Sequence, residues 1–213
     1  MRWYHVVAVL ALALLLFGGG GAAVVSAVKK AKGKRVTNAP AGPDGIVRVP
    51  PDELARQAGV SLDVYALARM LRSEHGSEAE RVKVAVGWAA VNQAKASGVS
   101  ISRLLLRGTA KGGSDGYFGA QNVGKYASTR TDPTTDDVAI AAKVLGRTVP
   151  DPTGGATQFD SPAAQRALVA KNLKGYSKGP EAVAAERLKR SDLVTVPGID
   201  PDHLRFWRPR GAA

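Results

Sequence analysis

One glutamate, Glu74, stands where a side chain could act as a general acid and base. It ends a predicted helix that carries Val64, Leu67 and Leu71 at helical spacing. The following segment, residues 82–91, is almost wholly apolar, so the two helices should pack together. A carboxyl held against apolar groups has its ionised form disfavoured, so we expect Glu74 to stay protonated near neutral pH and to donate to a glycosidic oxygen. The local pattern alone also fits a solvent-exposed glutamate at a helix end.

Many enzymes that cleave glycosidic bonds use a second carboxylate, and the sequence does not single one out. Glu78 and Glu80 fall in the first turn of a predicted helix, where negative charge complements the helix dipole, and this role accounts for both. The remaining candidates lie in or beside two long predicted loops: Asp115, Asp132 and Asp160.

The loop of residues 116–129 contains side chains suited to sugar binding. It mixes aromatic, amide and hydroxyl groups, which stack on sugar rings or bond their hydroxyls, and we assign Gln121 and Tyr126 to substrate binding. An ordinary surface loop is the alternative. Residues 119–125 also match the spacing of a phosphate-binding loop. Tyr126, however, replaces the Ser or Thr that binds magnesium there, and no apolar strand precedes the loop, so that interpretation is rejected.

The residues used by other hydrolase classes are missing from the sequence. Cysteine is absent, and the three histidines, His5, His75 and His203, have no metal-site spacing, so we expect neither a metal nor a cofactor. There is no Gly-x-Ser-x-Gly or His-Glu-x-x-His motif, and the one Ser-x-x-Lys string lies at residues 26–29. Cleavage of an amide bond is therefore disfavoured.

Two blocks of the chain share their order and spacing with one known family. The first block is Glu74-His-Gly-Ser-Glu78, followed by Val84-Ala-Val86 and Asn92-Gln93. The second is Asp151-Pro-Thr-Gly-Gly-Ala-Thr-Gln-Phe159, after an alanine-rich predicted helix that ends at Gly146. Over residues 62–162 the chain resembles the SleB-type cell wall hydrolases, the spore cortex-lytic family. It departs from the family where His-Gly-Ser replaces Ala-Arg-Gly after Glu74, and where Gln93 replaces Arg.

The resemblance implies a lysozyme-like helical domain with a single catalytic glutamate, which corresponds to Glu74. It also implies lytic transglycosylation of peptidoglycan, in which the 6-hydroxyl of N-acetylmuramic acid attacks its own C1 and leaves a 1,6-anhydro end. No second carboxylate is needed for this reaction, because the nucleophile belongs to the substrate. In the second block we assign Thr157, Gln158 and Phe159 to substrate binding.

The elements that must position these residues are mostly short helices. Ser61 is placed to cap the helix of residues 62–74, which Gly76 would end. Ser77 and Glu80 form a Ser-x-x-Glu pattern that predicts a capping box at the start of the next, long helix. We therefore expect a mainly α domain.

Further helices, loops and a strand are predicted along the rest of the chain. The long helix should end near residue 97, and others are predicted at 52–58, 100–106, 133–145, 161–174 and 180–190. Two loops rich in glycine, serine, threonine or proline cover residues 108–132 and 149–159, and the second includes a short strand around Thr157.

The N-terminal residues predict a targeting segment. Val6 to Val28 is apolar and uncharged, long enough for a membrane span and also compatible with a signal peptide. We expect residues 1–28 to be an anchor or signal, 29–50 a basic flexible tether, 51–175 the catalytic domain, and 176–213 a C-terminal helix and basic tail. This arrangement predicts that the protein is located in the cell envelope, or in a phage particle. More basic residues follow the apolar segment than precede it, however, and by the positive-inside rule this would leave the C-terminal domain in the cytoplasm.

The net charge of +12 fits nucleic acid, an anionic membrane surface or an acidic wall polymer. We do not expect nucleic acid, because the basic residues are scattered apart from one run after the apolar segment. The expected partners are peptidoglycan and, through the N-terminal segment, a membrane. Three alternatives stay open: a hydrolytic muramidase, a non-catalytic membrane-tethered protein for wall binding or assembly, and a basic nucleic-acid-binding protein.

Overall fold

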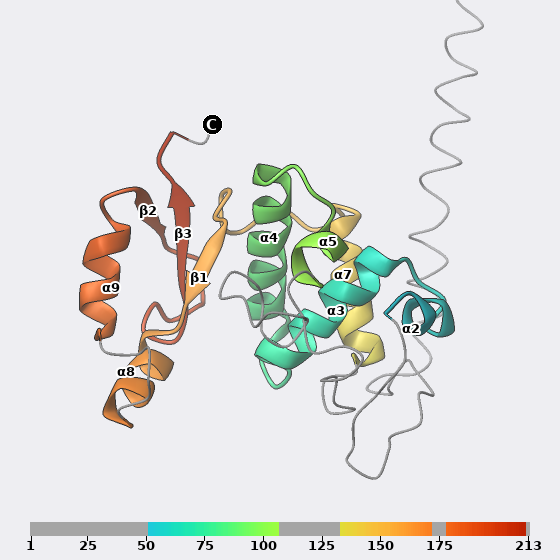
Figure 1. Ribbon diagram of the computed structural model, residues 1–213, viewed down its shortest axis with the longest axis horizontal. Coiled ribbons are helices and arrows are strands. Elements are labelled where there is room, and N and C mark those ends of the chain that lie inside the picture. The colour runs from blue at the N-terminus through green and yellow to red at the C-terminus, as the bar shows by residue number, and fades with distance from the viewer. Residues whose placement is uncertain (1–50, 107–132, 172–177, 212–213) are drawn as a thin grey trace, which may run out of the picture.

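The computed structural model describes residues 51–106, 133–171 and 178–211, which form mostly helices and a small three-stranded sheet (Figure 1). The prediction of a mainly helical domain with a small β element is therefore confirmed. The predicted targeting segment, tether and first long loop lie outside these ranges. None of the described helices is long and apolar enough to cross a membrane.

The described elements are α2 (Pro51–Gln57), α3 (Leu62–His75), α4 (Glu80–Ala96), α5 (Ile101–Leu105), α7 (Thr135–Leu145), β1 (Gln158–Asp160), α8 (Pro162–Ala170), α9 (Pro180–Arg187), β2 (Ser191–Val194) and β3 (Arg205–Pro209).

Serine caps begin three of the helices where the sequence places them. The hydroxyl of Ser61 accepts from the Val64 amide at 3.3 Å at the start of α3. Ser100 and Ser161 cap α5 and α8 in the same way. Each hydroxyl satisfies an amide that has no partner within its own helix, which is why these positions locate the helix starts well.

The capping box predicted for Ser77 and Glu80 is wrong. Helix α4 begins at Glu80 with Ala79 as its N-cap, and no side chain caps it. The chain is still turning at Ser77, because the Glu78 amide bonds the His75 carbonyl oxygen at 3.1 Å. Ser77 is therefore too far from the first turn of α4 to cap it.

A capping box does occur at α7, two residues after the predicted start at Pro133. The Thr134 hydroxyl accepts from the Asp137 amide at 3.3 Å, and the Asp137 carboxylate accepts from the Thr134 amide at 2.9 Å. The start of α7 is set by this reciprocal pair rather than by the proline.

The C-terminal residues form strands that the sequence did not predict. β3 lies in the middle of the sheet, antiparallel to β1 on one side and to β2 on the other. Phe159 of β1 pairs with Phe206 of β3. Helix α9 ends at Arg187, earlier than predicted, because the chain then enters β2 at Ser191. The described part of α8 ends at Ala170.

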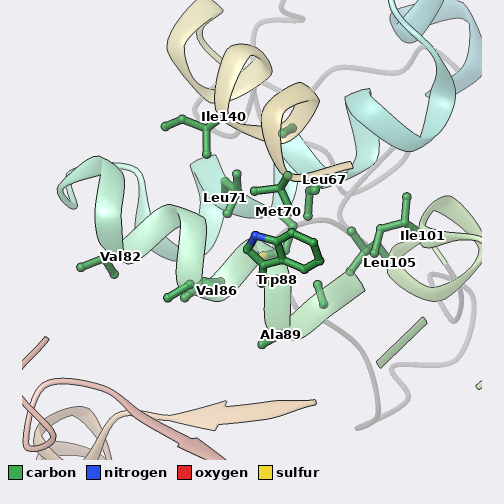
Figure 2. Packing of buried hydrophobic residues seen from close by; sticks show 14 of the residues in the cluster. Leu67, Met70, Leu71, Val82, Val86, Trp88, Ala89, Ile101, Leu105 and Ile140 are labelled. Atoms are coloured by element: carbon green, nitrogen blue, oxygen red, sulfur yellow. The ribbon is translucent and has the colours of Figure 1, made fainter. Parts of the chain in front are cut away.

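Helix α4 lies at the centre, with the sheet on one side and α3, α5 and α7 on the other (Figure 1). Trp88 of α4 packs among buried side chains of neighbouring helices (Figure 2). The core extends beyond the helices, because Leu204 and Phe206 belong to the same buried cluster. At Gly87 a Cβ would lie 3.4 Å from Cγ2 of Val144, so a small residue lets α4 and α7 approach closely. The C-terminal segment is therefore part of the packed core.

A buried ion pair joins α4 to α7. Nζ of Lys83 lies 2.7 Å from Oδ1 of Asp137, and the two side chains are 8% and 0% exposed. The same ammonium donates to the carbonyl oxygen of Gly76 at 3.1 Å. Asp137 also accepts from the Thr134 hydroxyl at 2.8 Å. Both charges are thus compensated by several hydrogen bonds, as burial requires.

Replacing Lys83→Met should lower the free energy of unfolding by about 3–5 kcal/mol, because it leaves the Asp137 carboxylate buried without its cation. The double variant Lys83→Met/Asp137→Asn should lose less, since the amide is uncharged and still accepts from Thr134. Urea unfolding followed by circular dichroism measures both values.

The matched control is Lys143→Met, which removes a more exposed pair with Glu80. It should cost no more than about 1 kcal/mol. A loss at Lys83 as small as the loss at Lys143 would contradict the importance of the buried pair.

Candidate functional site

Glu74 lies in the last turn of α3, and its side chain is exposed. The expectation that the following apolar helix shields this carboxyl is therefore wrong. Burial along α3 runs from Tyr65 to Leu71 and stops there. Past Leu71 the described residues leave the Glu74 side chain open to solvent.

The turn after Glu74 is held from inside the domain. Two cations of the flanking helices donate to the Gly76 carbonyl oxygen, Lys83 from Nζ at 3.1 Å and Arg72 from a guanidinium nitrogen at 3.4 Å. A Cβ at Gly76 would lie 2.5 Å from the Arg72 carbonyl oxygen, so the backbone there needs a glycine. The end of α3 is thus fixed to α4 and, through Lys83, to α7.

His75 packs between the end of α3 and the sheet. Its ring meets Phe159 of β1 edge-on, with the centroids 5.6 Å apart, and Phe159 in turn lies 6.3 Å from Phe206. Burial lowers the pKa of His75 to about 4, with smaller effects from Glu78, which raises it, and from His203 and Lys83, which lower it. Nε2 of His75 is buried and has no hydrogen-bond partner in the described part of the chain. The imidazole is therefore neutral at physiological pH and acts there as a packing group.

The second sequence block forms a tight turn around Asp151. Oδ1 of Asp151 accepts from the amide and hydroxyl of Thr153 at 2.8 and 2.6 Å, and Oδ2 accepts from the Gly155 amide at 3.0 Å. Gly154 and Gly155 both have positive φ, which favours glycine. The Asp151 carboxylate, the Thr153 hydroxyl and the two glycines of this block are therefore needed to form the turn itself.

Asn92 of α4 fastens this turn to the helices. Its Nδ2 donates to Oδ2 of Asp151 at 2.9 Å and to the carbonyl oxygen of Ala156 at 3.1 Å. The chain then enters β1, where Phe159 reaches His75. The two blocks, far apart in sequence, therefore fold into one unit next to Glu74.

The predicted substrate-binding residues differ in their burial and in their contacts. Phe159 is half-buried against the end of α3. Thr157 is half-buried, with its amide bonded to the Trp207 carbonyl oxygen at 3.0 Å. Gln158 is exposed and accepts from Arg187 of α9 at 3.3 Å, so β1 directs it toward α9 rather than toward His75. Gln121 and Tyr126 lie outside the described residues.

Two carboxylates that were considered as second acids have other partners. Asp160 accepts from Nε1 of Trp207 at 2.7 Å and from Arg205 at 3.1 Å, so it holds β3 to β1. Glu78 lies before α4 and not in its first turn, which corrects its assignment to the helix dipole. Its Oε1 lies 3.0 Å from Nε2 of His203. Asp115 and Asp132 lie outside the described residues.

A polar pocket opens between the N-terminal end of α4 and α7, on the side of the Lys83–Asp137 pair. Glu74 is not among its lining residues, which are Glu78, Glu80, Lys83, Asp136, Ala139, Ile140 and Lys143. Within the three described ranges, no group of three or more His, Asp or Glu side chains is arranged to hold a metal ion.

Sequence reasoning missed Lys83, Asn92 and His203. Lys83 had a usable signal, because it is the one charged residue in the apolar stretch of α4. Asn92 stands out in the sequence only as part of the family pattern, and its contact with Asp151 cannot be predicted from spacing. His203 carries no local signal, since its contact depends on how the C-terminal segment packs.

Comparisons with protein-family models, with curated proteins and with solved structures found no match for this chain.

Acidification should destabilise the protein through His75. Its pKa is about 4 in the folded state and 6.5 in the reference state, so between these values the unfolded chain binds more protons. The free energy of unfolding should therefore fall as the pH is lowered from 6.5 to 4, by at most about 3 kcal/mol from this residue.

The comparison variant is His75→Phe, which keeps a ring against Phe159 but cannot titrate. Urea unfolding of both proteins at pH 7 and pH 4.5 separates the His75 contribution from that of the other groups. Equal pH dependence in the two proteins would show that the burial of His75 has no consequence for stability.

Proposed function

We propose that this protein cleaves peptidoglycan glycan strands between N-acetylmuramic acid and N-acetylglucosamine as a lytic transglycosylase, with Glu74 as its catalytic residue. The observation that carries the proposal is the joining of the two sequence blocks. Asn92 bonds the Asp151 turn, and Phe159 packs on His75, immediately beside Glu74. The resemblance to SleB-type cell wall hydrolases rests on these same blocks, and the contacts explain why their residue types occur together.

The proposed reaction needs one carboxyl used twice. Glu74 donates its proton to the oxygen that links C1 of N-acetylmuramic acid to N-acetylglucosamine, and the C1–O bond breaks. The 6-hydroxyl of the same muramic acid residue attacks C1 and releases its proton to the Glu74 carboxylate. The acid is regenerated, and the products are a 1,6-anhydro end and a free N-acetylglucosamine hydroxyl.

The exposure of Glu74 sets a condition on this reaction. A general acid works best where water is excluded, and Glu74 is accessible in the free protein. The bound glycan strand must itself cover the carboxyl, which requires a ligand that extends over the end of α3. A polymer meets this requirement better than a small sugar does.

The proposed place of action is the cell envelope, with residues 1–28 as a membrane anchor or signal peptide and residues 29–50 as a tether. Most of the excess of Lys and Arg over Asp and Glu lies outside the described residues, whose own charges are nearly balanced. In this arrangement the basic tether would contact an anionic surface while the domain binds glycan.

A non-catalytic protein for wall binding or assembly is the second candidate. It is favoured by the exposure of Glu74 and by the His-Gly-Ser sequence after it. Such a protein would bind peptidoglycan sacculi and release no fragments.

Digestion of purified peptidoglycan by the full-length protein tests these functions, with the soluble products identified by mass spectrometry. We expect fragments with 1,6-anhydro ends, and Glu74→Gln should lower the rate by about 10²- to 10⁴-fold because the amide cannot donate an acidic proton. The control Glu181→Gln, an exposed glutamate of α9, should cleave at the wild-type rate.

Each other outcome has a clear meaning. Fragments with reducing ends would show that the protein is a hydrolytic muramidase and not a transglycosylase. Binding to sacculi without fragments would favour the non-catalytic protein. Equal rates for wild type and Glu74→Gln would remove Glu74 from the mechanism.

A further inference from the structure

The loop between β2 and β3 packs against the turn that follows Glu74. Val196, Ile199 and Leu204 of this loop are buried in the same cluster as the helices. Gly198 has a φ of +76°, and a Cβ there would lie 3.6 Å from the guanidinium of Arg81 in the first turn of α4. The loop is therefore held in place by apolar burial and by close packing on the first turn of α4.

His203 extends from this loop to Glu78. Its Nε2 lies 3.0 Å from Oε1 of Glu78, and the two side chains are 47% and 30% exposed. Either the charged ring or the neutral tautomer with its proton on Nε2 donates to the carboxylate. Because the loop is already ordered by its buried side chains, little further entropy is lost when this contact forms.

Glu78 is the residue that closes the turn. Its amide donates to the carbonyl oxygen of His75, the neighbour of Glu74, at 3.1 Å. Lys83 and Arg72 hold the other end of the turn at Gly76. The turn is thus held at Gly76 from inside the domain and at Glu78 from the C-terminal segment.

We propose that His203 and Glu78 form a positioning pair, which fixes the last turn of α3 and with it the carboxyl of Glu74. The pair touches no reacting atom in this scheme and acts through the backbone of His75 and Glu78. This inference rests on the proposed function of Glu74. It adds that residues 195–204, which lie outside the stretch that resembles the SleB family, take part in ordering the site.

The first test measures order directly. Hydrogen exchange of the full-length protein, followed by mass spectrometry on peptides that cover residues 72–80, should be faster in His203→Ala than in wild type. His203→Gln should restore protection, because its amide nitrogen can donate to Glu78. The melting temperature should stay within about 3 °C in both variants, since the pair is partly exposed.

The second test measures turnover of peptidoglycan. In His203→Ala we expect kcat to fall about tenfold with KM changed by less than about twofold, because the carboxyl is misplaced while the glycan contacts remain. His203→Gln should return kcat to within about threefold of wild type. A double variant, His203→Ala/Glu78→Ala, should be no slower than the slower single variant, since both remove the same contact.

The matched control is Arg166→Ala, which removes an ion pair to Asp202, the residue before His203 in the same loop. It should change neither exchange at residues 72–80 nor kcat. If His203→Ala also leaves both unchanged while wild type cleaves and Glu74→Gln does not, the positioning pair is wrong and the proposed function stands. If the wild-type protein releases no fragments, both the proposed function and the role of the pair in positioning a catalytic residue are wrong.

Discussion

The fold around the candidate site depends on the buried contact between Lys83 and Asp137. This ion pair connects three elements, because Lys83 also donates to the carbonyl that ends α3, and Asp137 also completes the cap of α7. Charges so deeply buried are tolerated only where every partner is in place. The requirement fixes the end of α3 relative to both neighbouring helices, and Glu74 lies in that last turn. Apolar packing around Trp88 supplies most of the stability, but this polar contact determines where the site lies.

Local signals predicted most of the helices. Ser61, Ser100 and Ser161 marked helix starts correctly, because a cap acts on amides a few residues away. The prediction from Ser77 failed for a tertiary reason. The Gly76 carbonyl is held by Lys83 and Arg72, so the turn continues and α4 begins later.

Long-range contacts were beyond the reach of sequence reasoning. β2 and β3 are short strands with several charged residues, and β3 pairs with β1, whose residues lie more than forty positions away in sequence. The exposure of Glu74 was missed because its spacing from Leu67 and Leu71 matches a buried face, while the continuous burial along α3 ends at Leu71. The Asp151 block was noticed through a family pattern, and its residue types turn out to serve a structural turn. A recurring pattern of this kind therefore identifies the frame of a site more reliably than its ligand contacts.

The central place of β3 has a consequence for how the chain folds during synthesis. β1 follows directly after the Asp151 turn, yet its hydrogen-bonding partner is β3, residues Arg205–Pro209. A ribosome that has completed α3, α4 and α7 has therefore produced the helical core without the strand that backs Phe159. The unit beside Glu74 can assemble only after β3 has emerged, so any activity that depends on this unit must wait until the ribosome has passed residue 209.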